Sequence, residues 1–245
     1  MNGPLAIAAD AAPQNRVPLG TPSLPIPRYL SQAYWWAYVH PNAVHLFERD
    51  WLVNTILFGN YARLRDAALA ELGAVVHGRT LQVACVYGNL TRKLQQRLAA
   101  DAHLDIVDVL PIQLKNLSEK LPTDARVSLL HGDSSTLACG DASYDNVLLF
   151  FLLHEQPDAV RSATLAEAMR VVKPGGRVVI VDYHRPCVWH PSRPLMRLVF
   201  RKLEPFAMAL WNHEVIDFLP PGLRPTALTK RTYFGGLYQK LVLTR

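Results

Sequence analysis

Short apolar runs alternate with longer amphipathic stretches along the chain from residue 79 onward. Runs rich in Val, Leu and Ile predict strands near 80–85, 104–107, 126–130, 146–150 and 177–182. The intervals show helical periodicity, most clearly at 89–99, 111–120 and 158–172. This alternation predicts an α/β fold, with a parallel sheet and helices on both faces. Segments 226–228 and 237–243 have the pattern of a closing hairpin, which would bring the mostly parallel sheet to seven strands.

The first 78 residues have a different pattern. Residues 1–27 contain six Pro and little periodicity, which is typical of a flexible tail. An aromatic cluster follows, made of Tyr29, Tyr34, Trp35, Trp36 and Tyr38. From Pro41 to Leu72 the pattern is helical, with Gly59 as a break and Gly73 as a stop. We expect a flexible tail at 1–27, an N-terminal helical cap at 28–78 and the α/β domain at 79–245.

Composition narrows the class of protein. A length of 245 residues allows one large domain plus an appendage. The three Cys residues form neither a CxxC pair nor a disulfide framework, which favours a reducing compartment. No run of 18 apolar residues predicts a spanning helix, and the N-terminus lacks the pattern of a secretory signal.

The net charge of +6 is concentrated near the C-terminus. Residues 184–245 hold ten Lys/Arg against three Asp/Glu, and the first 183 residues are close to neutral. Because this basic segment is also strongly apolar, it fits an anionic membrane surface better than a nucleic acid. We therefore expect a cytoplasmic protein that lies peripherally at the inner face of the membrane and binds no nucleic acid.

Residues 80–91, TLQVACVYGNLT, nearly match the strand-to-helix loop of quinone-pathway methyltransferases that use S-adenosylmethionine, LDVACGTGDLT. Gln82 stands where that loop has an acidic residue, and Val86-Tyr87 replace Gly-Thr. Glycines let the backbone approach a cofactor closely, so the changes leave two interpretations. Either the site is inactive, or it holds the cofactor in a different pose for different chemistry.

Five motifs, in the same order and with similar spacing, extend this resemblance along most of the α/β domain. They are the loop at 81–91, the IVDV segment at 106–109, HGDS at 131–134, Tyr144-Asp145, and KPGG at 173–176. With them, residues 79–245 resemble a Rossmann-like class I methyltransferase domain of the ubiquinone/menaquinone type. The Val-Tyr-Gly loop, the aromatic leader and the helix that follows it resemble, more specifically, the RquA family of rhodoquinone biosynthesis. That resemblance implies ubiquinone as the substrate and rhodoquinone as the product, an amino group drawn from S-adenosylmethionine, and a divalent ion, preferably Mn²⁺.

Candidate cofactor ligands follow the first three strands. Asp108, next to Val109, is placed to accept the ribose hydroxyls, although it could be a solvated loop carboxylate. Asp133, next to Ser134, is placed for the adenine amino group, although it could cap a helical turn. The remaining candidates belong to the loop and the helix after it: Gln82, Cys85, Val86, Tyr87, Gly88, Asn89 and Thr91. The unpaired amides at 88–89 favour the carboxylate of the cofactor.

The changed loop suggests a hypothesis about the amino end of the cofactor. A carboxylate keeps a neighbouring ammonium protonated, and Gln82 supplies no such charge. We expect Gln82 and Val86-Tyr87 to redirect the amine toward the quinone ring. Tyr87 could stack on the quinone or act as a catalytic acid or base, but a packing role is nearly as well supported.

Candidate metal ligands follow the fourth and fifth strands. His154, Asp182 and His184 lie near the expected substrate position, and Mn²⁺ accepts carboxylate and imidazole ligands. His154 is also a candidate catalytic residue. A histidine in such a loop more often bonds the backbone, so this alternative stays open.

The stretch 191–211 predicts a helix with Arg193, Arg197 and Arg201 on one face and an apolar stripe beside them. Such a helix could contact a membrane or pack on the domain. Three functions therefore remain: amination of ubiquinone, conventional methyl transfer to a quinone or phenol, and binding of the cofactor without catalysis. The sequence leaves the oligomeric state open.

Overall fold

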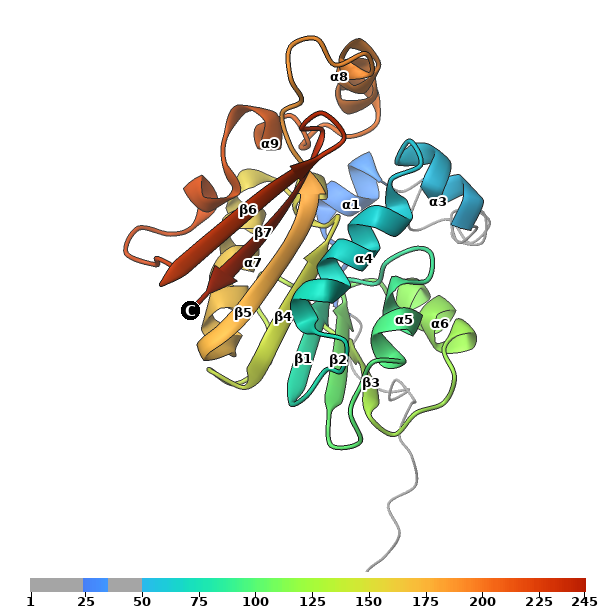
Figure 1. The fold of residues 1–245 in the computed structure, drawn as a ribbon, viewed down its shortest axis with the longest axis vertical. Coiled ribbons are helices and arrows are strands. Elements are labelled where there is room, and N and C mark those ends of the chain that lie inside the picture. The colour runs from blue at the N-terminus through green and yellow to red at the C-terminus, as the bar shows by residue number, and fades with distance from the viewer. Residues whose placement is uncertain (1–23, 35–49) are drawn as a thin grey trace, which may run out of the picture.

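A seven-stranded sheet in the order β3-β2-β1-β4-β5-β7-β6 organises the computed structural model, which describes residues 24–34 and 50–245 (Figure 1). The strands are β1 (Arg79–Val83), β2 (His103–Asp108), β3 (Val127–His131), β4 (Tyr144–Phe150), β5 (Val172–Tyr183), β6 (Ala227–Tyr233) and β7 (Tyr238–Thr244). The first five strands are parallel, and β7 pairs antiparallel with both β5 and β6. The predicted seven-stranded, mostly parallel sheet is confirmed, including its closing hairpin.

Helices cover both faces of the sheet, because successive residues of its central strands point to opposite sides. On β4, Leu148 and Phe150 belong to one buried cluster, while Val147 and Leu149 belong to another. The first cluster packs against α4 (Tyr61–Leu72), α5 (Leu90–Gln95) and α6 (Pro111–Lys120). The second packs against α7 (Asp158–Val171) and the 3-10 turn η3 (Val215–Phe218).

The start of β5 is irregular. Pairing with β4 begins at Val172, and the KPGG segment is part of the strand, where the register with β4 shifts. A Cβ at Gly176 would lie 2.7 Å from the backbone oxygen of Asp145, so the irregular strand needs glycine there. Asp145 itself accepts the Arg79 N–H and pairs with Lys173, which agrees with a structural role.

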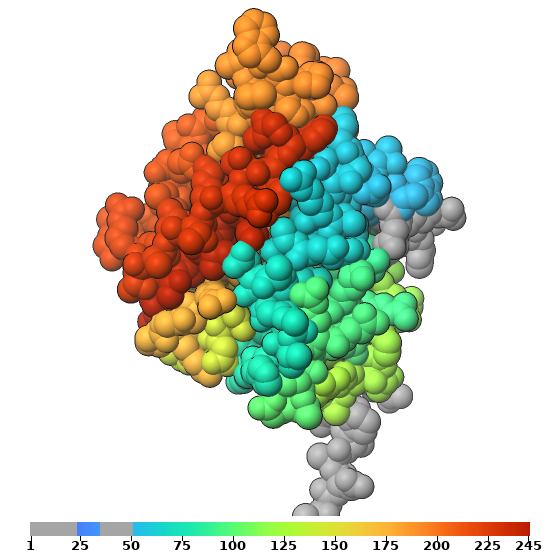
Figure 2. Space-filling view, in the orientation of Figure 1, coloured from blue at the N-terminus to red at the C-terminus, as the bar shows by residue number. Residues whose placement is uncertain are grey.

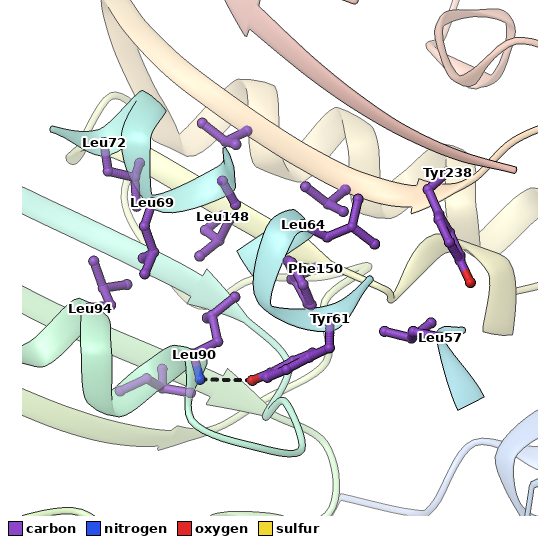
Figure 3. Close-up of a cluster of buried hydrophobic side chains, with 14 of the residues drawn as sticks. Leu57, Tyr61, Leu64, Leu69, Leu72, Leu90, Leu94, Leu148, Phe150 and Tyr238 are labelled. Carbon is purple, nitrogen blue, oxygen red and sulfur yellow. Dashed lines mark hydrogen bonds between the residues drawn. The ribbon is translucent and has the colours of Figure 1, made fainter. Parts of the chain in front are cut away.

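The N-terminal segment packs into the core of the sheet domain. It contains α1 (Arg28–Ala33), α3 (Asp50–Ile56) and α4, and Gly59 and Gly73 take positive φ at the predicted break and stop. Figure 3 shows α4 side chains among those of the sheet and α5, with the Tyr61 hydroxyl accepting the Leu90 N–H at 3.0 Å. Most of the predicted tail, the start of the helix at Pro41, and Trp35, Trp36 and Tyr38 lie outside the described residues.

The predicted helix at 191–211 is two helices. The first is α8 (Arg193–Lys202) and the second is the short α9 (Ala209–Asn212). Pro205 lies in the connection, where its ring and missing N–H disfavour a continuous helix. In Figure 1, α8 lies at the end of the molecule toward which β5 runs, beyond the sheet.

Candidate functional site

A cavity of about 570 Å³ lies beyond the carboxyl ends of the parallel strands. Its floor comes from the carboxyl ends of β1, β2, β3 and β4 and the residues that follow them, namely 84–87, 107–110, 132–134, 150–152 and 154–155. Residues of α1, of the α3–α4 region and of α8 form the remaining walls. Most of the lining is apolar, with a few polar groups between the apolar side chains, which is typical of small-molecule sites in open α/β sheets.

Side chains of α4 and α6 hold the loop after β1. The Tyr61 hydroxyl accepts the Leu90 N–H and donates to the Tyr87 carbonyl oxygen at 3.3 Å. Gln113 of α6 donates to the Tyr87 hydroxyl at 2.8 Å. Ala84 takes a positive φ of 73°, a strained conformation for a residue other than glycine. The neighbouring helices therefore hold the loop in its conformation.

Asp108 lies at the end of β2, and its carboxylate forms part of the cavity wall. It accepts the Cys85 N–H at 2.7 Å and the Leu110 N–H at 2.8 Å, one bond on each oxygen. Burial raises the pKa of Asp108, and the backbone N–H groups of Cys85 and Leu110, together with the Cys85 side chain, oppose that rise. Because each carboxylate oxygen can accept more than one bond, the group can also accept from a ligand hydroxyl.

Asp133 follows β3 and also lines the cavity, as do Val109 and Ser134. Its Oδ1 accepts both the backbone N–H and the hydroxyl of Ser135, so Asp133 stabilises the local turn. Both of these bonds use the same oxygen, so Asp133 can form the turn and accept a ligand donor with Oδ2. Ser134 is committed within the protein, bonding Thr164 and accepting from Gln156.

Several of the predicted cofactor ligands lie outside the cavity lining. Cys85, Val86 and Tyr87 line it, whereas Gln82, Gly88, Asn89 and Thr91 do not. The fully buried Gln82 amide donates to the Ala84 carbonyl and to the Thr91 hydroxyl, both at 3.0 Å. Asn89 accepts from Arg65 instead. Gln82 thus bonds the loop to the following helix without lining the cavity.

A buried group of ionisable side chains is centred on His154, and three of its members line the cavity. His154 Nδ1 is 2.9 Å from Asp182 Oδ1, and its Nε2 is 3.9 Å from Glu155 Oε1 and 3.8 Å from Glu204 Oε2. Burial lowers the pKa of His154, but the carboxylates of Asp182, Glu204 and Glu155 outweigh it and raise the pKa to about 9. Burial also raises the pKa of Glu204, although His154 opposes the rise.

The three predicted metal ligands do not converge. His154 and Asp182 are in contact, but His184 is 2.8 Å from the Gly236 carbonyl oxygen through Nδ1, and its Nε2 lies near Lys230. The three candidate ligands therefore do not come together as one site in this structure. In residues 24–34 and 50–245, no group of three His, Cys, Asp or Glu side chains could hold a metal ion.

Neither Tyr29 nor Glu204 was among the candidate site residues that the sequence predicted. Tyr29 of α1 lines the cavity, and burial followed by the charges of Glu155, Asp133 and Asp108 raises the pKa of its hydroxyl. Glu204 comes from the connection between α8 and α9. The aromatic leader was the only signal for Tyr29, and nothing in the sequence pattern distinguished Glu204.

Comparisons with known proteins agree with this geometry. Residues 80–176 match a family model described as "Methyltransferase domain". Demethylmenaquinone methyltransferase from Staphylococcus aureus is 28% identical over 163 residues, which cover 66% of this chain and 65% of that protein.

Solved structures of methyltransferases share the fold at low identity. N-methyltransferase NodS from Bradyrhizobium japonicum superposes with a TM-score of 0.54 at 15% identity, covering 78% of this chain and 96% of that one. A methyltransferase from Aquifex aeolicus described as SAM-dependent gives 0.52 at 16%, covering 83% and 97%. The fold is therefore the Rossmann-like fold of class I methyltransferases. Within it, residues 80–176 are similar in sequence to the methyltransferase domain, and 163 residues of the chain are similar to a protein named demethylmenaquinone methyltransferase.

Proposed function

We propose that this protein converts ubiquinone to rhodoquinone, replacing one ring methoxy group with an amino group taken from S-adenosylmethionine. The observation that carries the proposal is the rebuilt loop. Val86 and Tyr87 form part of the cavity wall. Gln82, at the position of the usual acidic residue, lies outside the cavity lining and bonds Thr91. The loop is held by specific bonds from Tyr61 and Gln113, which argues against a decayed site.

The nucleoside half of S-adenosylmethionine fits the floor of the cavity. Asp108 offers two carboxylate oxygens to the ribose hydroxyls, and Asp133 offers Oδ2 to the adenine amino group. Tyr29 lies close to both carboxylates and would cover this half of the ligand. These residues bind the donor and have no part in choosing which group it transfers.

The residues around the amino end of S-adenosylmethionine determine which group the protein transfers. An amine that lacks a carboxylate partner loses its proton more easily, because no charge stabilises the ammonium form. The Gln82 amide is neutral and bonds the Ala84 carbonyl and the Thr91 hydroxyl, so it places no charge beside the donor amine. S-adenosylmethionine then supplies a neutral amine that adds to the ring carbon bearing the methoxy group, whose C–O bond breaks.

His154 and Glu204 are placed to move the protons of this exchange. His154 is protonated at neutral pH, and Asp182 holds its ring, so it can give a proton to the departing methoxy oxygen, which leaves as methanol. Glu204, beside it on the cavity wall, can accept the proton that the amine loses. This exchange of methoxy for amine balances with methanol as the leaving group, but it leaves the nitrogen joined to the donor. Rhodoquinone is released when the C–N bond of the donor breaks by elimination, in which the carbon next to the α-carbon loses a proton, the ring nitrogen gains one, and the donor remnant leaves with a new C=C bond.

A divalent ion, which the resemblance implies, does not fit the described residues. The predicted trio is separated, and no other set of three ligands replaces it among them. The proposed roles of His154 and Glu204 therefore involve no metal.

Conventional methyl transfer to a quinone is the second candidate. It is favoured by the sequence relative, a protein named demethylmenaquinone methyltransferase. The two reactions use the same donor and a similar ring, and they differ in which end of the donor faces the quinone.

One assay separates the candidates. Purified full-length protein is incubated with a short-chain ubiquinone and S-adenosylmethionine labelled with heavy nitrogen in its amino group, with and without Mn²⁺. Mass spectrometry of the quinone should show loss of methoxy and gain of labelled nitrogen. An added methyl group establishes the second candidate, and an unchanged quinone under all conditions overturns both.

A double variant tests the role of the loop. Gln82→Asp with Val86→Gly restores the residues of the methyltransferase pattern and should reduce amination while S-adenosylhomocysteine still binds. Thr91→Ser keeps the hydroxyl that bonds Gln82 and is the matched control. Amination at the wild-type rate in the double variant would contradict the proposed pose.

A further inference from the structure

Large apolar side chains are exposed at one end of the molecule, around α8 and α3. Of eleven such residues in the described chain, seven belong to 51–56 and 188–203: Trp51, Ile56, Val188, Trp189, Leu195, Leu198 and Leu203. Trp189 is 93% exposed, and its neighbour Val188 is 69% exposed. We call these seven residues the apolar tip. In Figure 2, the orange segment that contains most of them projects from the body of the molecule.

Basic side chains surround the apolar tip without any acidic partner in the same segment. Residues 185–203 hold five Lys/Arg and no Asp or Glu. Arg197, Arg201 and Lys202 of α8 are exposed beside Leu198. A surface of this kind combines apolar groups that can enter lipid with positive charges that favour anionic headgroups.

The two faces of α8 have different surroundings. Met196 and Phe200 are buried against the protein, and Val199 lines the cavity. Leu195 and Leu198 remain more than half exposed, so the packing of the domain accounts for only one side of the helix. The predicted apolar stripe thus splits between the core and the exposed face.

The apolar tip also forms the mouth of the cavity. Ile56 of α3 and Leu195 and Leu203 near α8 line the cavity and are at least 42% exposed. The cavity must therefore reach the surface between α3 and α8. A molecule that leaves the cavity at this mouth passes directly onto the apolar tip.

We propose that the apolar tip docks on an anionic lipid bilayer, so that the cavity opens at the membrane surface. Trp189 and Val188 enter the interface, the Arg side chains meet lipid phosphates, and the sheet stays in water. None of the helices in the described residues has the length and apolarity needed to cross a bilayer. Delivery of a lipid-tailed quinone through the mouth rests on the proposed function, whereas the docking rests on the surface alone.

Vesicle co-sedimentation of the full-length protein tests this inference. The protein should sediment with phosphatidylcholine vesicles that contain phosphatidylglycerol, bind pure phosphatidylcholine far less, and dissociate as salt is raised. Trp189→Ser with Leu198→Ser should weaken binding by roughly tenfold or more, as should Arg197→Glu with Arg201→Glu.

Matched controls come from β6 and the loop before it. Leu228→Ser removes an exposed apolar residue of β6, and Arg224→Glu reverses an exposed charge, so neither should change binding. Equal loss in the controls, or unchanged binding in the tip variants, overturns the inference. Sedimentation velocity tests the alternative that the apolar tip binds a second copy of the chain. A dimer that dissociates when Trp189→Ser and Leu198→Ser are introduced would assign the tip to that second copy and not to a membrane.

Failure of the docking is distinguishable from failure of the proposed function. S-adenosylhomocysteine affinity and turnover of a short-chain quinone in solution should be unchanged in the tip variants. Turnover without vesicle binding would overturn only the docking, and vesicle binding without turnover would overturn only the proposed function.

Discussion

Replacing Tyr61 by Phe should destabilise the protein and loosen the loop after β1. The hydroxyl accepts the N–H of the fully buried Leu90 at 3.0 Å and donates to the Tyr87 carbonyl at 3.3 Å. Without it, a buried donor has lost its acceptor, which costs about 2 kcal/mol. For a chain of this length, that corresponds to a fall in Tm of about 4–8 °C.

The same substitution should weaken S-adenosylhomocysteine binding. The bond to Tyr87 holds a cavity-lining residue, and a loss of about 0.5–1.4 kcal/mol on the bound loop corresponds to roughly twofold to tenfold weaker affinity. Thermal unfolding with and without the ligand measures stability, and calorimetry measures the affinity.

Tyr238→Phe is the matched control. Tyr238 is fully buried in the same cluster, and its hydroxyl has no hydrogen-bond partner in the described chain (Figure 3). Its removal should leave Tm and affinity nearly unchanged or raise Tm slightly, since no bond is lost. If Tyr61→Phe unfolds within 1–2 °C of the control, a shift smaller than about 1 kcal/mol, the assigned role of the hydroxyl is refuted.

Three further predictions concern the site and the sheet. Asp133→Asn keeps the oxygen that accepts the bonds of its turn but replaces Oδ2 by an NH2 group, which is a donor. Calorimetry should therefore find S-adenosylhomocysteine bound about 10–100-fold more weakly, at an unchanged Tm. Because the folded pKa of His154 is raised to about 9, its stabilisation is present below its unfolded pKa of about 6.5 and is lost as pH rises through about 9. Glu204→Gln, which lowers that pKa, should flatten the decline in denaturant-measured stability over this window, and an identical slope would contradict the coupling. Gly176→Ala places a Cβ 2.7 Å from the Asp145 carbonyl, so it should lower the free energy of unfolding by about 1–3 kcal/mol in urea titration.

Periodicity was sufficient to predict the sheet, because strand and helix patterns are local. The five parallel strands were placed within a few residues, and α6 and α7 nearly matched their predicted bounds. The exceptions are places where tertiary contacts override local signals. The KPGG segment joins β5 because β4 pairs with it, although Pro and Gly by themselves predict a turn.

The candidate site divides in the same way. Asp108 and Asp133 could be placed from sequence, because the carboxyl ends of parallel strands share one edge and residues just after them line the cavity there. Gln82 was expected at the ligand, yet only the packed structure shows its amide turned to Thr91. His154 and His184 both follow strands, but Lys230 of β6 and Gly236 of the turn before β7 contact the second histidine.

The sequence by itself determined the order of elements, the two carboxylates of the cavity lining and the positive charge of the C-terminal quarter. Each of these depends on neighbours in the chain or on the geometry common to parallel sheets. Only the tertiary structure decided which distant residues come together: Tyr29 and Asp133 in the lining of one cavity, Glu204 beside His154, and residues of α3 and α8 at the mouth of that cavity. These contacts join segments far apart in the chain, and their positions follow from how helices pack on the finished sheet, which no local pattern encodes.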